Sequence, residues 1–143
     1  MEQQLPIMTE LGVQFTARSG METAASSGVH RGRPFGGVSI AWASNLNHVV
    51  KPLANYRHHR IVCVELLAVP NPILLASVYM PFYDSSNRAE CISETIDAIS
   101  MMEGIIEDHP HHQIIIGGDL NTELEGNSPF DIYWREFVLK YDL

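Results

Sequence analysis

Two long apolar runs, at residues 60–69 and 73–80, dominate the stretch RIVCVELLAVPNPILLASVYM (residues 60–80). Pro70, Asn71 and Pro72 separate them, and two prolines around an asparagine are typical of a tight connection. Runs of this length that are rich in Val, Ile and Leu favour strands buried on both faces. We therefore expect two strands that are buried on both faces and joined by a tight connection.

A helix is expected over residues 88–108. Its apolar residues recur at the spacing of one helical face and its acids lie largely elsewhere, and Asp108-His109-Pro110 would end it. Asn87 with Glu90 three residues later predicts a capping box. A second amphipathic helix is expected over residues 129–140. The expected buried face of the first helix consists of Ile92, Ile96, Ile99, Met102 and Ile106.

Shorter segments complete the pattern. Alternating apolar residues predict strands at residues 36–43 and around Val13 and Phe15, and an apolar run predicts one at residues 113–116. A weak helical pattern covers residues 2–11, and the segment 18–33 has the composition of a loop. A further short strand is expected at residues 49–53. Strands followed by a helix, a strand and a helix indicate an α/β layered domain in which the helix packs over a sheet.

Length and composition set limits on location. The 143 residues fit one domain, and no apolar run is long enough to cross a membrane. The first ten residues lack the basic and apolar regions of a secretion signal. We expect Cys63 and Cys91 to be free thiols, Cys63 as a small core residue, in an intracellular protein of the nucleus or cytoplasm.

The net charge of −8 by itself argues against a nucleic-acid binder, but the charge is unevenly distributed. Residues 61–143 hold fourteen acids against three basic residues. Residues 18–60 hold a single acid, Glu22, against six basic residues, which would allow a basic surface on one side of the protein. The simpler interpretation is ordinary surface charge. The six are Arg18, Arg31, Arg33, Lys51, Arg57 and Arg60.

Three segments carry candidate chemistry. In IIIGGDLN (114–121), a strand and two glycines lead to Asp119 and Asn121. If the backbone stays extended there, both side chains point the same way. Together they could then bind a hydrated Mg²⁺ or orient a water at a phosphate. The alternative is an Asx-type turn that satisfies local backbone groups.

In SVYMP (77–81), Tyr79 would offer its hydroxyl to a phosphate, or serve as a core tyrosine. Small residues and Arg33 at 32–38 predict either a phosphate-facing loop or a simple turn.

Together, GRPFGGVSIAW (32–42), SVYMP and IIIGGDLN resemble the endonuclease/exonuclease/phosphatase superfamily, in particular the apurinic-endonuclease-like nuclease domains of non-LTR retrotransposons. The resemblance covers roughly residues 5–125 but only the middle of the family's domain. It implies that Asp119 positions or activates the attacking water, that Asn121 contacts the scissile phosphate and that Tyr79 lies near that phosphate. It also implies Mg²⁺ or Mn²⁺ as cofactor, with Asp119 as ligand, and DNA as partner.

The chain departs from the family pattern at both ends. The family opens with strands that carry an Asn and a metal-binding Gln-Glu, and neither motif precedes residue 33. It closes with a Ser-Asp-His element, whereas residues 122–143 contain no His. Adjacent His58-His59 and His111-His112 would point to opposite faces of a strand and are expected to be solvated. Residues 1–143 are thus expected to form part of a four-layered α/β sandwich, two sheets flanked by helices, without its N- and C-terminal portions.

Three functions follow from these observations. The first is a DNA-cleaving phosphodiesterase that binds its metal weakly and is catalytically incomplete in this chain. The second is a phosphatase acting on inositol phosphates or other small phosphates, which the acidic net charge favours. The third is a non-catalytic fragment that serves as an interaction module, which the missing ligands favour. The sequence leaves the oligomeric state open.

Overall fold

The computed structural model describes residues 10–18, 37–56, 58–82 and 85–143, so the expected helix at 2–11 and the loop at 18–33 lie almost wholly outside the described residues. The described elements alternate between strands and helices, as expected for an α/β domain. Their bounds are β1 Val13–Arg18, β2 Val38–Ala43, η1 Ser44–Leu46, β3 Val50–Pro52, β4 Ile61–Leu66, β5 Ile73–Tyr79, η2 Ser85–Asn87, α3 Arg88–Glu107, β6 Gln113–Asp119 and α4 Pro129–Tyr141.

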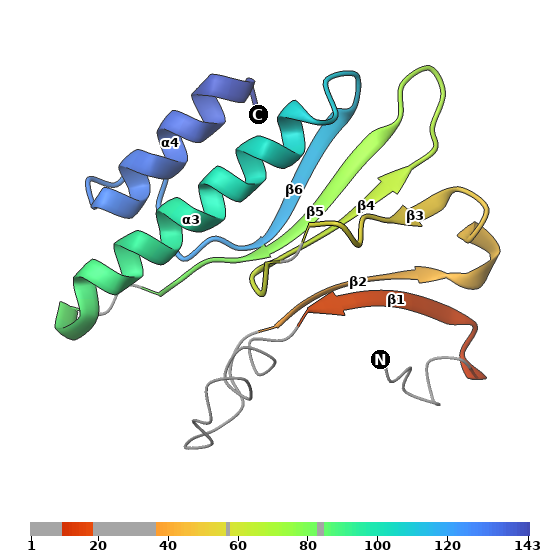
Figure 1. The fold of residues 1–143 in the computed structure, drawn as a ribbon, viewed down its shortest axis with the longest axis horizontal. Coiled ribbons are helices and arrows are strands. Elements are labelled where there is room, and N and C mark those ends of the chain that lie inside the picture. Colours follow the sequence, from red (N-terminus) through yellow and green to blue (C-terminus); the bar gives the residue numbers. More distant parts are fainter. Residues whose placement is uncertain (1–9, 19–36, 57, 83–84) are drawn as a thin grey trace.

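The strands form two sheets. A four-stranded sheet has the order β3-β4-β5-β6, and a two-stranded sheet pairs β1 with β2. Neighbours in the larger sheet are antiparallel except β5 and β6, which are parallel because α3 carries the chain back between them. In Figure 1 the helices lie on one side of the larger sheet and the β1–β2 ribbon on the other. The part of the chain that is described thus has three layers, and the expected α/β class is confirmed.

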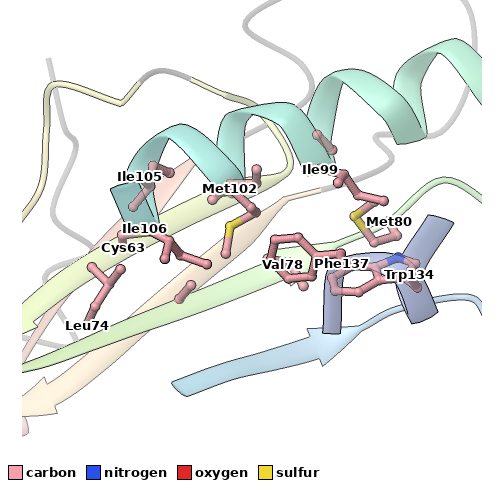
Figure 2. Packing of buried hydrophobic residues seen from close by; sticks show 13 residues of the cluster. Cys63, Leu74, Val78, Met80, Ile99, Met102, Ile105, Ile106, Trp134 and Phe137 are labelled. Carbon is pink, nitrogen blue, oxygen red and sulfur yellow. The ribbon is translucent and has the colours of Figure 1, made fainter. Parts of the chain in front are cut away.

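The main core lies between the helices and the larger sheet (Figure 2). Leu74, Ala76 and Val78 alternate along β5 toward α3 and are almost fully buried. Trp134 and Phe137 of α4 pack edge to face beside them, with ring centroids 5.3 Å apart. The continuous apolar run of β4 is buried on both faces, because α3 covers one face and the β1–β2 ribbon packs near the other.

Cys63 is the small core residue expected from the sequence. It is buried in β4 as a free thiol, and burial raises its pKa to about 12. Its thiol therefore stays protonated at neutral pH. Neither helix of the described residues combines the length and apolar composition that crossing a membrane requires.

The buried face of α3 differs from the expected one in its first half. Ile96 is 39% exposed, while Thr95 is fully buried. Thr95 fits there because its hydroxyl donates to the Cys91 carbonyl, 2.8 Å away, one turn earlier. From Ile99 onward the expected face is correct.

The expected capping box at the start of α3 is wrong, because Asn87 and Glu90 bond to each other through their side chains and not to the backbone.

Strand β6 continues further than the sequence indicates, through Gly117 and Gly118 to Asp119. Gly118 has a φ of +135° and lies so close to β5 that a Cβ would collide with the Val78 carbonyl. Only glycine allows both this backbone angle and this approach. Gly118 therefore lets β6 stay paired with β5 up to Tyr79 and Asp119.

Helix α4 begins with a capping box that joins it to the preceding loop. Ser128 Oγ accepts from the Asp131 N–H at 3.2 Å, and Asp131 Oδ2 accepts from the Ser128 N–H at 2.7 Å. Asp131 Oδ1 also accepts from the Thr122 hydroxyl at 2.6 Å and from the Glu123 N–H at 2.9 Å. Hydrogen bonds from Ser128, Thr122 and the Glu123 backbone hold the pKa of this carboxyl well below its usual range.

The two glycines of β6 give a matched test of the close approach. Gly118→Ala should lower the free energy of unfolding by about 2–4 kcal/mol, because the new methyl meets the Val78 carbonyl and φ is positive. Gly117→Ala should change it by less than about 0.5 kcal/mol, because a Cβ there meets open space. Urea denaturation measures both. Equal losses in the two variants would contradict the close packing at Gly118.

Asp131 should make the stability depend on acidity. Because its pKa is depressed in the folded state, its contribution is fully present above the unfolded-state pKa of about 3.9 and is lost as the pH falls through the folded-state value. Asp131→Asn should therefore have a lower free energy of unfolding than the wild type at neutral pH, and this difference should become smaller below about pH 4. Urea denaturation of both proteins over a pH series measures the difference in free energy of unfolding. A difference that does not change with pH would refute this account.

Candidate active site at the ends of strands β5 and β6

Tyr79 and Asp119 are the last residues of neighbouring parallel strands and are paired in register. The Met80 N–H donates to the Asp119 carbonyl at 2.8 Å, so the pairing continues to the strand ends. Paired residues of parallel strands project to the same face of a sheet. A half-buried phenol and an exposed carboxylate therefore lie side by side at the carboxyl edge of the sheet.

Asn121 reaches the same edge by a turn and not by an extended backbone. Its φ of +47° is left-handed, so the condition under which both side chains would point the same way is not met. Its N–H donates to Asp119 Oδ1 at 3.2 Å, so this segment forms the Asx-type turn that was the alternative interpretation. Its Nδ2 donates to the Met80 carbonyl at 2.8 Å. These bonds fix Asn121 beside β5 and leave its Oδ1 and Asp119 Oδ2 as the acceptors for a ligand.

Arg60, one of the six basic residues of the 18–60 segment, adds a positive charge beside Tyr79. Its Nη1 donates to the Tyr79 carbonyl at 3.3 Å, and its guanidinium carbon lies 5.8 Å from the centroid of the Tyr79 ring. Its Nη2 forms an ion pair with Glu94 of α3 at 2.6 Å. Arg60 thus stands on the other side of Tyr79 from Asp119. Only the pairing of β4 with β5 reveals this, because Arg60 and Tyr79 are distant in the chain.

The histidines next to Arg60 are arranged differently from the expectation. His58 and His59 do not point to opposite faces but stack, with ring centroids 4.9 Å apart and an angle of 15° between planes. Burial lowers the pKa of both side chains, and the charge of Arg60 lowers it further. Both imidazoles are therefore mainly uncharged at neutral pH, which leaves Arg60 as the cation beside Tyr79 among the described residues.

The metal ligands within the described residues are too few for magnesium. Mg²⁺ takes roughly six oxygen ligands in octahedral geometry. Asp119 offers one carboxylate, of which one oxygen already accepts from Asn121, and Asn121 adds one carbonyl oxygen. Among the described residues no group of three His, Cys, Asp or Glu is placed to hold a metal ion. These residues alone do not fit a resident Mg²⁺.

The third candidate segment is described only in part. Arg31 and Arg33 lie outside the described residues, so the expected phosphate-facing loop stays a prediction. Gly37 has a φ of +148°, and a Cβ on it would come within 3.3 Å of the Arg18 carbonyl. This glycine allows the chain to enter β2 beside β1, which fits the simple turn that was the alternative.

Two grooves lie elsewhere on the molecule. One, of about 400 Å³, runs between α3 and the segment before β4 and includes His58 and Tyr56, whose hydroxyl donates to Asp108 at 2.8 Å. Burial and this bond raise the pKa of Tyr56 to about 12. The other, of about 370 Å³, runs along β6 beneath α4. Neither of these two grooves includes Tyr79, Asp119 or Asn121.

Comparison with known proteins supports the fold and leaves the chemistry open. No protein-family model and no curated protein sequence matches the chain. A solved structure, that of the human Nocturnin catalytic domain with a bound sulfate anion, is similar over 96% of this chain, with a TM-score of 0.56 and 13% sequence identity. The match covers 51% of that chain, so this chain spans about half of its length. The chain therefore has an α/β fold that corresponds to about half of that domain.

Proposed function

We propose that this chain is part of a metal-dependent phosphodiesterase of the nuclease type that acts on DNA. Asp119 orients or activates the attacking water, Asn121 contacts the scissile phosphate, and Tyr79 donates a hydrogen bond to a phosphate oxygen. The observation that carries the proposal is the paired register of Tyr79 and Asp119 at one sheet edge, to which Asn121 is tied through Met80.

The chemistry of this edge suits a phosphate group. A phenol hydroxyl donates to a phosphate oxygen, while a carboxylate accepts from the water that attacks it. Arg60 lies close enough to Tyr79 to make the local potential less negative, although Glu94 offsets part of its charge. The similar Nocturnin domain was solved with sulfate, an anion of the same shape as phosphate. This similarity supports an anionic substrate in general.

We propose further that the chain is catalytically incomplete by itself. One carboxylate and one amide oxygen hold Mg²⁺ or Mn²⁺ weakly, since these ions require more oxygen ligands. The remaining ligands would come from residues outside the described ranges or from a longer protein. Residues that position a metal act together, so the loss of several leaves little activity.

Two other functions have specific support. The net charge of −8 favours a small phosphate ester over a polyanion, because an acidic surface repels DNA more strongly than a small substrate. The lack of a three-ligand metal group in the described residues favours a non-catalytic interaction module. Both alternatives keep the fold, since one fold serves many functions.

A nicking assay tests the catalytic part of the proposal. The purified chain should relax supercoiled plasmid slowly with Mg²⁺ or Mn²⁺ and not with EDTA, and Asp119→Ala should reduce this residual rate by about a hundredfold or more. Glu136→Ala, at an exposed acid on α4, is the matched control and should leave the rate unchanged. A rate that Asp119→Ala leaves intact would belong to a contaminant and would remove Asp119 from the mechanism.

Binding distinguishes the three functions even when turnover is too slow to detect. NMR spectra of the ¹⁵N-labelled chain should show shifts at residues 79–80 and 119–122 when a short DNA duplex and Mg²⁺ are added. Shifts that appear there only with an inositol phosphate, accompanied by phosphate release, would support the phosphatase alternative. No shifts at these residues with either ligand would reject the strand-end site and favour the interaction module.

A further inference from the structure

Among the described residues, strand β6 is the last strand of the larger sheet, and no described strand pairs with its outer edge. The Gln113 N–H donates to the Pro72 carbonyl, and the Asp119 carbonyl accepts from the Met80 N–H, so residues 113 and 119 face β5. Because backbone groups alternate along a strand, Ile114, Ile116 and Gly118 direct theirs to the opposite side. Within the described part of the chain, no further strand pairs with that side.

This edge lacks the features that usually prevent pairing with another chain. Natural edge strands are protected by Lys, Pro, bulges or a covering segment. Strand β6 has the sequence QIIIGGD, with no Lys or Pro, and its Ile115 is 48% exposed. The β1–β2 ribbon packs chiefly against β4 and β5. Within the described part of the chain, an exposed and apolar strand that pairs with β5 over its whole length is therefore left open on its other side.

The apolar groove of about 370 Å³ lies next to this edge. Its walls include Ile114 and Ile116 of β6 and Trp134 and Val138 of α4. Helix α4 packs against α3 on the same face of the sheet (Figure 1). A strand added beside β6 would thus find backbone partners at the edge and apolar side chains on that face, the two requirements of strand addition.

We propose that this edge pairs with the same edge of a second copy of the chain, antiparallel and with the two-fold axis at Ile116. In this register Ile114 of one copy opposes Gly118 of the other, and Ile116 opposes itself. All three residues with outward backbone groups then form hydrogen-bonded pairs. Two four-stranded sheets join into one continuous sheet across the dimer.

The side chains of β6 are complementary to those of a second, antiparallel copy of the same strand. Each exposed Ile115 opposes a Gly117, so a large side chain lies where the other copy has none. At the strand ends Asp119 opposes Gln113, whose amide can donate to the carboxylate, and His111 lies just beyond. This self-complementarity is the reason to favour a second copy over an unrelated strand. A two-fold interface of this kind closes on itself and does not grow into fibres.

The mass of the chain in solution tests the dimer. Light scattering after gel filtration should give twice the 16.0 kDa of the chain, with dissociation on dilution. Ile116→Pro should abolish the dimer, because proline removes an outward N–H and is tolerated on the open side of an edge strand. Ile116→Ala is the matched control: it loses the same side-chain contacts, keeps the N–H, and should still dimerise. Circular dichroism checks that both variants fold.

Cross-linking tests the register independently. In a Cys91→Ser background, Ile116→Cys should form a disulfide-linked dimer on mild oxidation, since the two Cα atoms meet at the axis within the range of a disulfide. Ile114→Cys should not, because its copies are separated by roughly four residues of extended chain, about 13 Å. Both positions are half-buried on the same groove wall, so their accessibility is matched.

Several results would overturn the proposal. A monomeric wild type at every concentration would leave the edge to a strand of another protein or of a longer chain. A dimer that persists in Ile116→Pro would use another surface. Cross-linking through position 114 in place of 116 would refute the register, and assemblies larger than a dimer would refute the two-fold closure.

Discussion

The parallel pairing of β5 with β6 is the interaction on which the rest of this structure depends. It requires Gly118, because any side chain at that position would collide with the Val78 carbonyl of the neighbouring strand. It also requires α3, whose buried face covers the sheet and returns the chain to the start of β6. With this pairing in place, Tyr79 and Asp119 end their strands at the same level. The candidate site is thus a consequence of strand register.

Short-range hydrogen bonds then place the residues that follow the strands. Asn121 leaves the extended conformation at once, and its side chain is held by the Met80 carbonyl. Asp131 binds Thr122, Glu123 and Ser128 together and so ties the loop after the site to the start of α4. Such a loop changes conformation only by breaking several bonds at once, which keeps the polar groups of the site oriented.

The two sides of β6 have contrasting roles in the proposals made for this protein. One side is paired with β5 and brings Asp119 to the site, while the other is open and apolar. A sheet edge of this kind is satisfied by a further strand. The chain spans about half the length of the similar Nocturnin domain, and its described residues provide too few metal ligands for Mg²⁺. We have accordingly proposed that the remaining metal ligands come from outside the described residues and that a second copy of the chain pairs with the open edge.

The sequence by itself determined which of the described segments become strands and helices. Hydrophobic periodicity and proline positions located β4, β5, α3 and α4 closely, because these signals depend on neighbours in the chain. It did not determine that Thr95 would be buried in place of Ile96, since burial depends on how α3 lies on the sheet. Nor did it place Arg60 against Tyr79 or turn Asn121 into a left-handed conformation. Those contacts join residues far apart in sequence or compete with equally good local alternatives, and only the pairing of strands and the packing of the helices decides between them.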